Sequence, residues 1–188
     1  MKRLLTALIA TAFLFSCNNE EKKADEPAKK TEEKTASAST ITYPYKADYS
    51  SDFSVGDANH SKMVLDLYKM WEDNKIDDMK TLLADSVMIE FPDGNKFADN
   101  KADSMIAMAK KVRKEYSSLK IDMDAWMPSR SNDQKTDFVL VWSREHTVDA
   151  KGKADSARVH AYFVIVNNKI RSWSEYTQKM APEPMAKK

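Results

Sequence analysis

The chain has 188 residues, of which 42% are hydrophobic and 31% charged, so it can hold one globular domain with additional segments. Its formal net charge of +1 gives no basic surface for nucleic acid, and we expect no nucleic-acid partner. The single cysteine excludes an intrachain disulfide and a cysteine-based zinc site. Because the three histidines are irregularly spaced, we also expect no metal and no cofactor.

Residues 1–16 are expected to form a lipoprotein signal peptide. Two basic residues precede an uncharged run that is too short to span a bilayer. The run ends in the sequence LFSC, which resembles the lipobox of bacterial lipoproteins, although Phe15 stands where a smaller residue is usual. The resemblance implies cleavage before Cys17 and acylation of its thiol. The alternative is an ordinary secretory leader with an incidental cysteine.

Residues 17–40 are expected to be a disordered, charged tether, because they contain no large apolar side chain that could build a core. The acidic pair at 20–21 resembles surface-export signals of some envelope lipoproteins. Asn18 stands where the best-known inner-membrane retention signal has aspartate. We therefore expect a lipid-anchored protein of the bacterial cell envelope, with the outer membrane favoured over the inner, and contact with the membrane through lipidated Cys17.

Residues 41–56 form an aromatic arm. Aromatic side chains recur there at Tyr43, Tyr45, Tyr49 and Phe53. Pro44 and Gly56 argue against a regular helix. Because aromatic groups at this density rarely remain in water, we expect the arm to lie along the domain surface.

The domain is expected at 57–180, and its first half combines three helices with one strand. Apolar residues follow helical spacing from Met63 to Trp71, over a short second helix at 76–83, and in a third helix that starts near Asn100. Between the last two helices, 87–91 is predicted as a strand and 92–95 as a turn.

The second half is predicted to be mostly strands. Alternation over 119–125 indicates a strand with one wet face, followed by a polar loop at 128–135. Three long strands are then rich in β-branched and aromatic residues, and they lie at 137–148, 157–166 and 169–176. Turns at 149–152 and 167–168 separate them. Residues 181–188 are expected to be a disordered tail.

This order of elements resembles the nuclear transport factor 2-like superfamily, which includes SnoaL-like cyclases and ketosteroid isomerases. The sequences LLADSVMIEFPDG at 82–94 and YFVIVNNKI at 162–170 carry the resemblance. It implies an α+β fold, a cone-shaped roll whose curved antiparallel sheet has about three helices packed on its concave face. It also implies a pocket between sheet and helices, and a possible homodimer through the outer face of the sheet.

The resemblance gives little support for isomerase chemistry. Isomerases of this family carry an aspartate base before the proline of a Glu-Asp-Pro motif. Here Glu90 and Pro92 match, but Phe91 stands between them and cannot take a proton. The nearest equivalent of their helical tyrosine is Tyr68, one residue out of step. Whether the chain is an enzyme stays open, and the sequence favours no catalysis.

The closing hairpin predicts which side chains share a face. If 167–168 is a two-residue loop, strict pairing places Tyr162 opposite Trp173 and His160 opposite Glu175 on one face. Residues alone leave open which face is concave. The resemblance favours this one as the pocket wall, with His160 where isomerases place a protonated acid. His160 and Glu175 form either an acid–base pair or a structural cross-strand pair.

We therefore hypothesise an envelope lipoprotein whose domain binds a small, partly apolar molecule without catalysis. The expected ligand-binding residues are His160, Tyr162, Trp173, Glu175, Phe91 and Tyr68. One alternative is a SnoaL-like cyclase, isomerase or dehydratase using His160, Tyr162 and Glu175. A second is a protein-interaction module using the sheet face or the aromatic arm. Residues 144–146 are expected to be exposed charges at a strand end.

The leader leads to a prediction about anchoring. Replacement of Cys17→Ser should release the protein from membranes or block its processing, because the acylated thiol is the expected anchor. Membrane fractionation together with the mass of the mature N-terminus measures this. A cleaved variant that stays in the membrane fraction, or a mature chain starting elsewhere than residue 17, would contradict it.

Overall fold

The computed structural model describes residues 42–180, which form three α-helices, one 3-10 helix and six strands. The helical segments are α1 (Ala58–Glu72), α2 (Ile76–Met79), the 3-10 turn η1 (Lys80–Leu82) and α3 (Ala102–Arg113). The strands are β1 (Phe53–Val55), β2 (Leu83–Glu90), β3 (Tyr116–Ser131), β4 (Thr136–Asp149), β5 (Ala154–Val166) and β6 (Lys169–Lys179).

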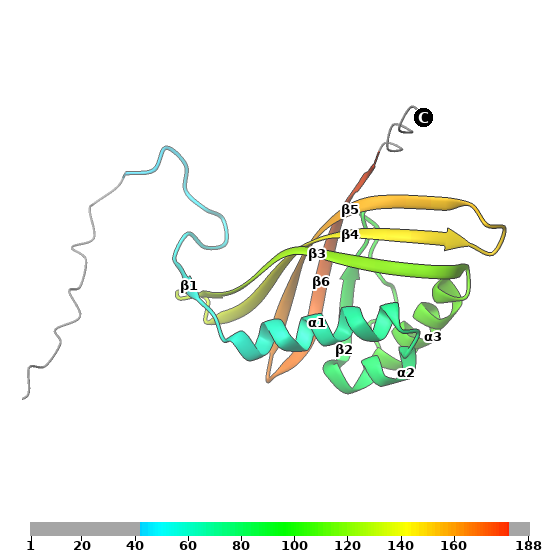
Figure 1. Cartoon of the computed structure of the whole chain (residues 1–188). Helices are drawn as coiled ribbons and strands as arrows, with labels where there is room; N and C mark the ends of the chain where they lie inside the picture. Colours follow the sequence, from blue (N-terminus) through cyan, green and yellow to red (C-terminus); the bar gives the residue numbers. More distant parts are fainter. Residues whose placement is uncertain (1–41, 181–188) are drawn as a thin grey trace, which may run out of the picture. The chain divides into compact units, whose positions relative to one another are not determined.

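The strands form one curved sheet in the order β1-β3-β4-β5-β6-β2, and the helices pack against one of its faces (Figure 1). Apolar residues of the helices meet those of the sheet there in a continuous core. The predicted α+β architecture is therefore confirmed. The sheet is mixed rather than antiparallel, because β2 runs parallel to β6.

Helix α1 is specified at both ends and along its buried face. The Asp57 side chain accepts a hydrogen bond from the backbone N–H of Asn59 (2.8 Å), which caps the first turn. Val64, Leu67 and Tyr68 are buried on one stripe of the helix. This stripe carries Tyr68 to the inner face of the sheet.

Two predicted boundaries differ from the structure. Strand β3 continues through Pro128 to Ser131, where a loop was expected. The Pro128 carbonyl accepts from the backbone N–H of Gly56 on the β1 side (3.1 Å). Because the nitrogen and carbonyl of a strand residue point the same way, the missing N–H lies towards this sheet edge and not in the β4 ladder. Helix α3 starts at Ala102, after Asn100 adopts a positive φ of 54°.

The hairpin between β5 and β6 has the predicted loop but not the predicted register. Asn167 and Asn168 both have positive φ, as a two-residue loop requires. Ile165 pairs with Ile170, but Val164 pairs with Ser172, so one extra residue of β6 bulges out. The prediction that Tyr162 faces Trp173 and His160 faces Glu175 is therefore wrong. Their partners are Ser174 for Tyr162 and Tyr176 for His160.

The extra residue is Arg171. Its guanidinium donates a hydrogen bond to the Ser86 carbonyl (2.7 Å). Ser86 lies in a part of β2 between two stretches that pair with β6. Because a bulge inverts the side-chain alternation beyond it, Trp173 lies on the same inner face as Ile170, three residues away.

The aromatic arm contacts the domain from Tyr49 onwards. The rings of Tyr49 and Phe53 both meet Phe138 of β4 edge-on, with centroid distances of 6.0 and 6.3 Å. Tyr43 and Tyr45 are exposed. Residue 41 of the arm lies outside the described residues, as do the predicted leader, the whole tether and the tail.

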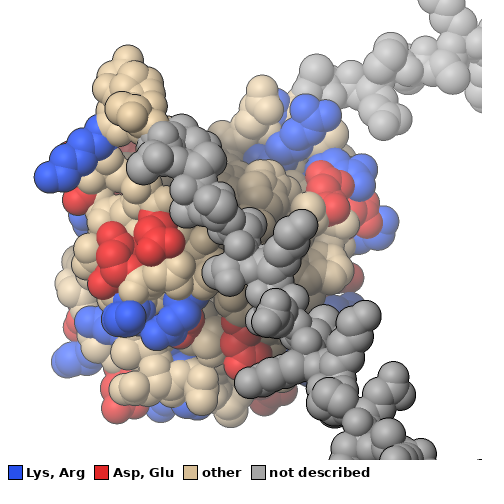
Figure 2. All heavy atoms as spheres, turned by 90° about the vertical axis from the view of Figure 1, so that its left-hand side faces the viewer, with Lys and Arg blue, Asp and Glu red and all other residues tan. Residues whose placement is uncertain are grey.

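Surface charge on the described part of the chain is mixed. In the view of Figure 2, Lys and Arg residues lie among Asp and Glu residues, without a large area of one sign. Eleven close contacts within 42–180 join a Lys or Arg to an Asp or Glu. This pattern agrees with the near-neutral composition. Within 42–180, none of the helices combines the length and apolar composition needed to cross a membrane.

Buried Arg113 connects the end of α3 to the end of α1. Its guanidinium donates to the carbonyls of Trp71 (3.1 Å), Glu72 (3.2 Å) and Tyr116 (3.0 Å). Two of these carbonyls belong to the last turn of α1, where no intrahelical donor is available. The positive charge there also complements the helix dipole. Arg113 thus holds α1, and with it Tyr68, against the sheet.

Replacement of Arg113→Met should lower the free energy of unfolding by about 3 kcal/mol, because it removes three hydrogen bonds that a buried guanidinium donates. Urea denaturation measures this loss. Lys111→Met, on the exposed side of the same helix, is the matched control and should change stability little. Equal effects of the two substitutions would contradict the structural role of Arg113.

Candidate functional site

A cavity of about 270 Å³ lies between the inner face of the sheet and the helices. Apolar and aromatic side chains make up most of its wall. The lining residues are Leu67, Tyr68, Trp71, Met79, Ile89, Phe91, Met105, Met108, Ala109, Val112, Tyr116, Leu119, Glu145, Phe163, Trp173 and Glu175. They come from α1, α2, α3 and from strands β2 to β6, together with Phe91 directly after β2.

Side chains with a hydroxyl or carboxyl group reach this cavity from four elements: Tyr68 of α1, Tyr116 of β3, Glu145 of β4 and Glu175 of β6. Strand alternation explains the position of Glu145, since it is in phase with the buried residues Val139 and Val141. The bulge in β6 explains the position of Glu175, which pairs with inward-facing Ala161.

Glu175 has one hydrogen-bond donor within the cavity. The indole Nε1–H of Trp173 donates to its Oε1 (3.1 Å). Burial raises the pKa of Glu175, because an ionised carboxylate loses water there, and the indole hydrogen bond opposes this shift. Trp173 thus orients Glu175 towards the cavity and favours its charged form.

Glu145 is more strongly perturbed. Burial and the neighbouring Glu175 carboxylate together raise the pKa of Glu145 to about 7. Its carboxylate accepts no hydrogen bond from any residue between 42 and 180. At neutral pH the cavity therefore contains a carboxyl group that is close to half-protonated.

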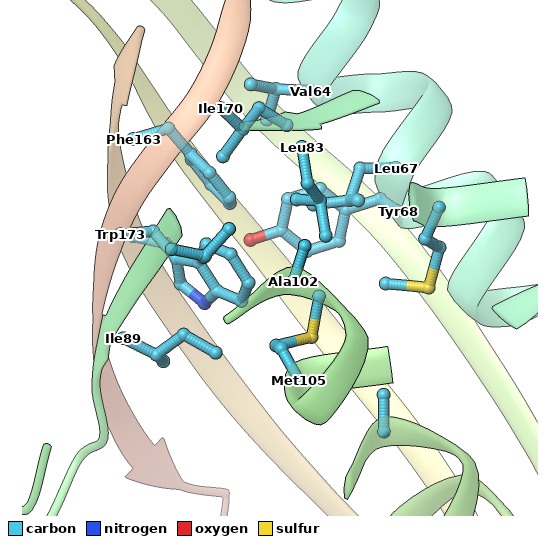
Figure 3. Close-up of a cluster of buried hydrophobic side chains, with 14 of the residues drawn as sticks. Val64, Leu67, Tyr68, Leu83, Ile89, Ala102, Met105, Phe163, Ile170 and Trp173 are labelled. Atoms are coloured by element: carbon cyan, nitrogen blue, oxygen red, sulfur yellow. The ribbon is translucent and has the colours of Figure 1, made fainter. Parts of the chain in front are cut away.

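The Tyr68 side chain is 8% exposed, and its hydroxyl makes no hydrogen bond within the described residues. In Figure 3 this hydroxyl points from α1 towards the space beside Phe163 and Trp173. Burial raises the pKa of Tyr68 well above its usual value, and the carboxylates of Glu175 and Glu145 add to the shift. Tyr68 therefore remains a neutral phenol facing the cavity.

The structure divides the sequence-predicted site residues between two faces. Phe91, Tyr68, Trp173 and Glu175 line the cavity together. His160 and Tyr162 lie on the opposite face, because the bulge inverts the side-chain alternation of β6 but not that of β5. The predicted pairing of His160 with Glu175 is therefore wrong.

His160 belongs to an aromatic row on the outer face. Its ring stacks on Trp142 at a centroid distance of 4.7 Å, and Tyr176 lies on its other side at 6.2 Å. Its Nδ1–H donates to the Val141 carbonyl (3.0 Å). Tyr162 continues the row beside Tyr176. A second hollow, of about 350 Å³, lies against this row.

Sequence reasoning missed Glu145. The expectation of exposed charges at 144–146 is correct for Arg144, whose Nε donates to Asp124 (2.9 Å) on the outer face. It is wrong for Glu145, which faces inward. The alternation from Val139 to Glu145 was the signal for this position, but it became interpretable only once the buried face of β4 was known.

Metal binding has no support in the cavity or elsewhere between residues 42 and 180. No three His, Cys, Asp or Glu residues in that range are arranged to hold a metal ion. Glu145 and Glu175 are the only members of these residue types that line the cavity.

No family model and no curated protein matches the sequence. Solved structures do share the fold. An NTF2-like protein of unknown function from Burkholderia pseudomallei is 14% identical with a TM-score of 0.54, covering 65% of this chain and 92% of that one. A protein described as a SnoaL-like polyketide cyclase from Jannaschia is 13% identical with a TM-score of 0.54, covering 67% and 90%.

A third structure is an LEH-like epoxide hydrolase from M. tuberculosis, 10% identical with a TM-score of 0.53, covering 63% of this chain and 82% of that one. At such identities the similarity concerns the fold alone. At that level the resemblance found in the sequence is confirmed.

The raised pKa of Glu145 predicts how stability depends on pH. Its ordinary value is 4.5 and its folded value about 7, so the folded protein binds more protons between these limits. The stabilisation that this proton uptake gives to the folded state is fully present below pH 4.5, and it is lost as pH rises through 7. The loss amounts to roughly 3 kcal/mol. Glu175 shifts in the same direction.

Urea unfolding of the parent and of Glu145→Gln at pH 5, 6, 7 and 8 measures this effect. The parent should lose stability towards pH 8, and the variant should lose clearly less. Glu90→Gln is the control, because Glu90 follows inward-facing Ile89 and is not part of the cavity wall. Identical pH dependence of the parent and Glu145→Gln would contradict the assignment.

Proposed function

We propose that this chain, which has the nuclear transport factor 2-like fold, binds a small and largely apolar molecule in its cavity without converting it. The observation that carries the proposal is a preformed, mostly apolar cavity with a few convergent polar side chains, the usual composition of a small-molecule site. Its volume of about 270 Å³ lies just below the range of roughly 300–1,000 Å³ that is typical for drug-sized ligands. The ligand is therefore small.

Phe91 supports binding without catalysis. It lines the cavity at the position where the resembling isomerases carry their aspartate base, and its ring cannot accept a proton. His160, the predicted counterpart of their protonated acid, lies on the outer face. Neither the base nor the protonated acid of the isomerase reaction therefore has its predicted counterpart in this cavity.

We also propose that the domain acts at the bacterial cell envelope, tethered through acylated Cys17 and located at the outer membrane. The support is the sequence: a short apolar run that ends at the only cysteine, followed by a charged segment. Cys17 lies outside the described residues. A lipid anchor would confine the binding domain to one membrane surface.

An enzyme is the second candidate function, and the perturbed Glu145 favours it. A carboxyl group with a pKa of about 7 is suited to general acid–base catalysis at neutral pH. Such an enzyme would use Glu145, Glu175 and Tyr68 instead of His160 and Tyr162. The neighbours named as an epoxide hydrolase and a polyketide cyclase make this chemistry plausible for the fold.

The outer face supports the remaining proposal, an interaction surface that includes a homodimer through the sheet. Trp142 and Tyr176 are 38% and 57% exposed there, although both are large aromatic residues. Aromatic side chains of this kind are enriched in protein interfaces. This surface is separate from the cavity, so binding in one does not exclude contacts through the other.

Filling the cavity should abolish ligand binding. Ala109 lines it from α3, so Ala109→Phe places a ring in the ligand volume. The full-length protein purified from its own host should show a bound small molecule by native mass spectrometry. The spectrum of the Ala109→Phe variant should lack the bound molecule. Titration of the parent with the apolar probe tert-butylbenzene should change its tryptophan fluorescence, and titration of the variant should not.

The matched control is Ala107→Phe, at an exposed position of the same helix, which should retain both signals. Binding unaffected by Ala109→Phe would place the ligand elsewhere and contradict the proposal. Conversion of the recovered molecule by the parent, but not by Glu145→Gln, would favour the enzyme candidate.

A further inference from the structure

The charged groups of the cavity have one sign. Glu145 and Glu175 reach it, and the lining residues include no Lys, Arg or His within the part of the chain that the structure describes. Burial removes water from both carboxyl groups, so each lacks the solvation that an ionised group requires. A bound anion would add to this repulsion, whereas a bound cation would relieve it.

The rest of the wall is unusually aromatic. Six of its side chains carry aromatic rings: Tyr68, Trp71, Phe91, Tyr116, Phe163 and Trp173. The rings of Phe163 and Trp173 are nearly parallel at 5.8 Å, and Tyr68 meets Phe163 edge-on at 5.8 Å. Aromatic faces attract cations, and rings grouped around a small cavity form the usual binding site for substituted ammonium groups.

Two polar side chains face the cavity without a hydrogen-bond partner among residues 42–180. The Tyr68 side chain is more than nine-tenths buried, and its hydroxyl forms no hydrogen bond to any residue between 42 and 180. Glu145 likewise accepts no hydrogen bond within that range, in contrast to Glu175, which accepts one from Trp173. Oxygens that border a cavity with unused hydrogen-bonding capacity indicate where the polar part of a ligand lies.

We propose that the ligand is an organic cation, an inference that rests on the proposed binding function. The ligand is a small, mostly apolar molecule with an ammonium nitrogen, and Glu145, Glu175 and the surrounding rings hold it. The nitrogen lies between the two carboxylates, and the apolar part contacts the helix side of the cavity. Tyr68 contributes an oxygen to the same polar end. The aromatic wall thus performs two tasks, excluding water and stabilising the charge.

This assignment makes affinity depend on pH. The titratable groups facing the cavity are Tyr68 of α1, Tyr116 at the start of β3, Glu145 of β4 and Glu175 of β6; α2, α3, β2 and β5 contribute none to its wall. Burial raises the pKa of both tyrosines above their usual value, so they stay neutral up to pH 8. Only the carboxyl groups change charge between pH 5 and pH 8, and a cation binds best once both have lost their protons.

Three probes of similar shape and different charge test the proposal on the full-length chain. Phenyltrimethylammonium is a permanent cation, tert-butylbenzene is its uncharged isostere, and benzenesulfonate is an anion. Their dissociation constants are obtained at pH 5 and pH 8 from intrinsic tryptophan fluorescence. We expect the cation to bind at least about tenfold more tightly than tert-butylbenzene at pH 8, and benzenesulfonate not to bind.

The ratio of cation affinity to neutral affinity is the decisive quantity. It should fall at pH 5, where Glu145 is protonated, and it should fall about tenfold at pH 8 in Glu145→Gln and in Glu175→Gln. Glu90→Gln should keep the ratio of the parent. Because the pH series uses the unaltered protein, it tests the same point even if a cavity variant fails to fold.

A ratio near one at pH 8 would overturn the organic-cation proposal, as would preferred binding of benzenesulfonate or a ratio that both Gln variants retain. In these cases tert-butylbenzene still binds, and the proposed binding function stands. If none of the three probes binds, the proposed function is overturned together with the inference.

Discussion

The β-bulge at Arg171 is the constraint on which the binding site depends. One extra residue in β6 inverts the side-chain alternation of the strand, so that Trp173 and Glu175 face the helices instead of the outer surface. The Arg171 guanidinium, which donates to the Ser86 carbonyl, links the bulge to β2. Without the bulge, the cavity would lose one of its two carboxylates and the indole that orients it.

The cavity combines features that each carry a cost in stability. Two carboxyl groups lie in an apolar wall, where burial raises the pKa of both and the Glu175 carboxylate raises that of Glu145 further. A buried tyrosine hydroxyl lacks a partner in the described part of the chain. A protein selected for stability alone would replace these groups by apolar ones. Their presence together in one small volume is the strongest indication that the volume serves a function.

The two faces of the sheet serve separate purposes. The inner face holds the core and the cavity, whereas the outer face carries the aromatic row around His160 and the contacts of Phe138 with the arm. Sequence analysis joined residues of both faces into a single site, because strict alternation was assumed through β6. A histidine opposite a glutamate is a reasonable acid–base hypothesis, but a register shift of one residue places His160 and Glu175 on opposite faces of the sheet.

The sequence by itself determined the helices, most of the strands and their order, because periodicity, turn asparagines and the apolar stripe of α1 are local properties. It also determined that the residue between Glu90 and Pro92 is Phe91, whose ring cannot take a proton. It did not predict strand β1 or the continuation of β3 through Pro128, because both depend on the pairing of these distant segments. Only the tertiary structure decided which side chains share the cavity. The bulge in β6 depends on interactions with β2 and β5 at once, which no local pattern encodes. Glu145 turns inward because the helices cover that face of β4, and the choice of covered face is a property of the whole fold.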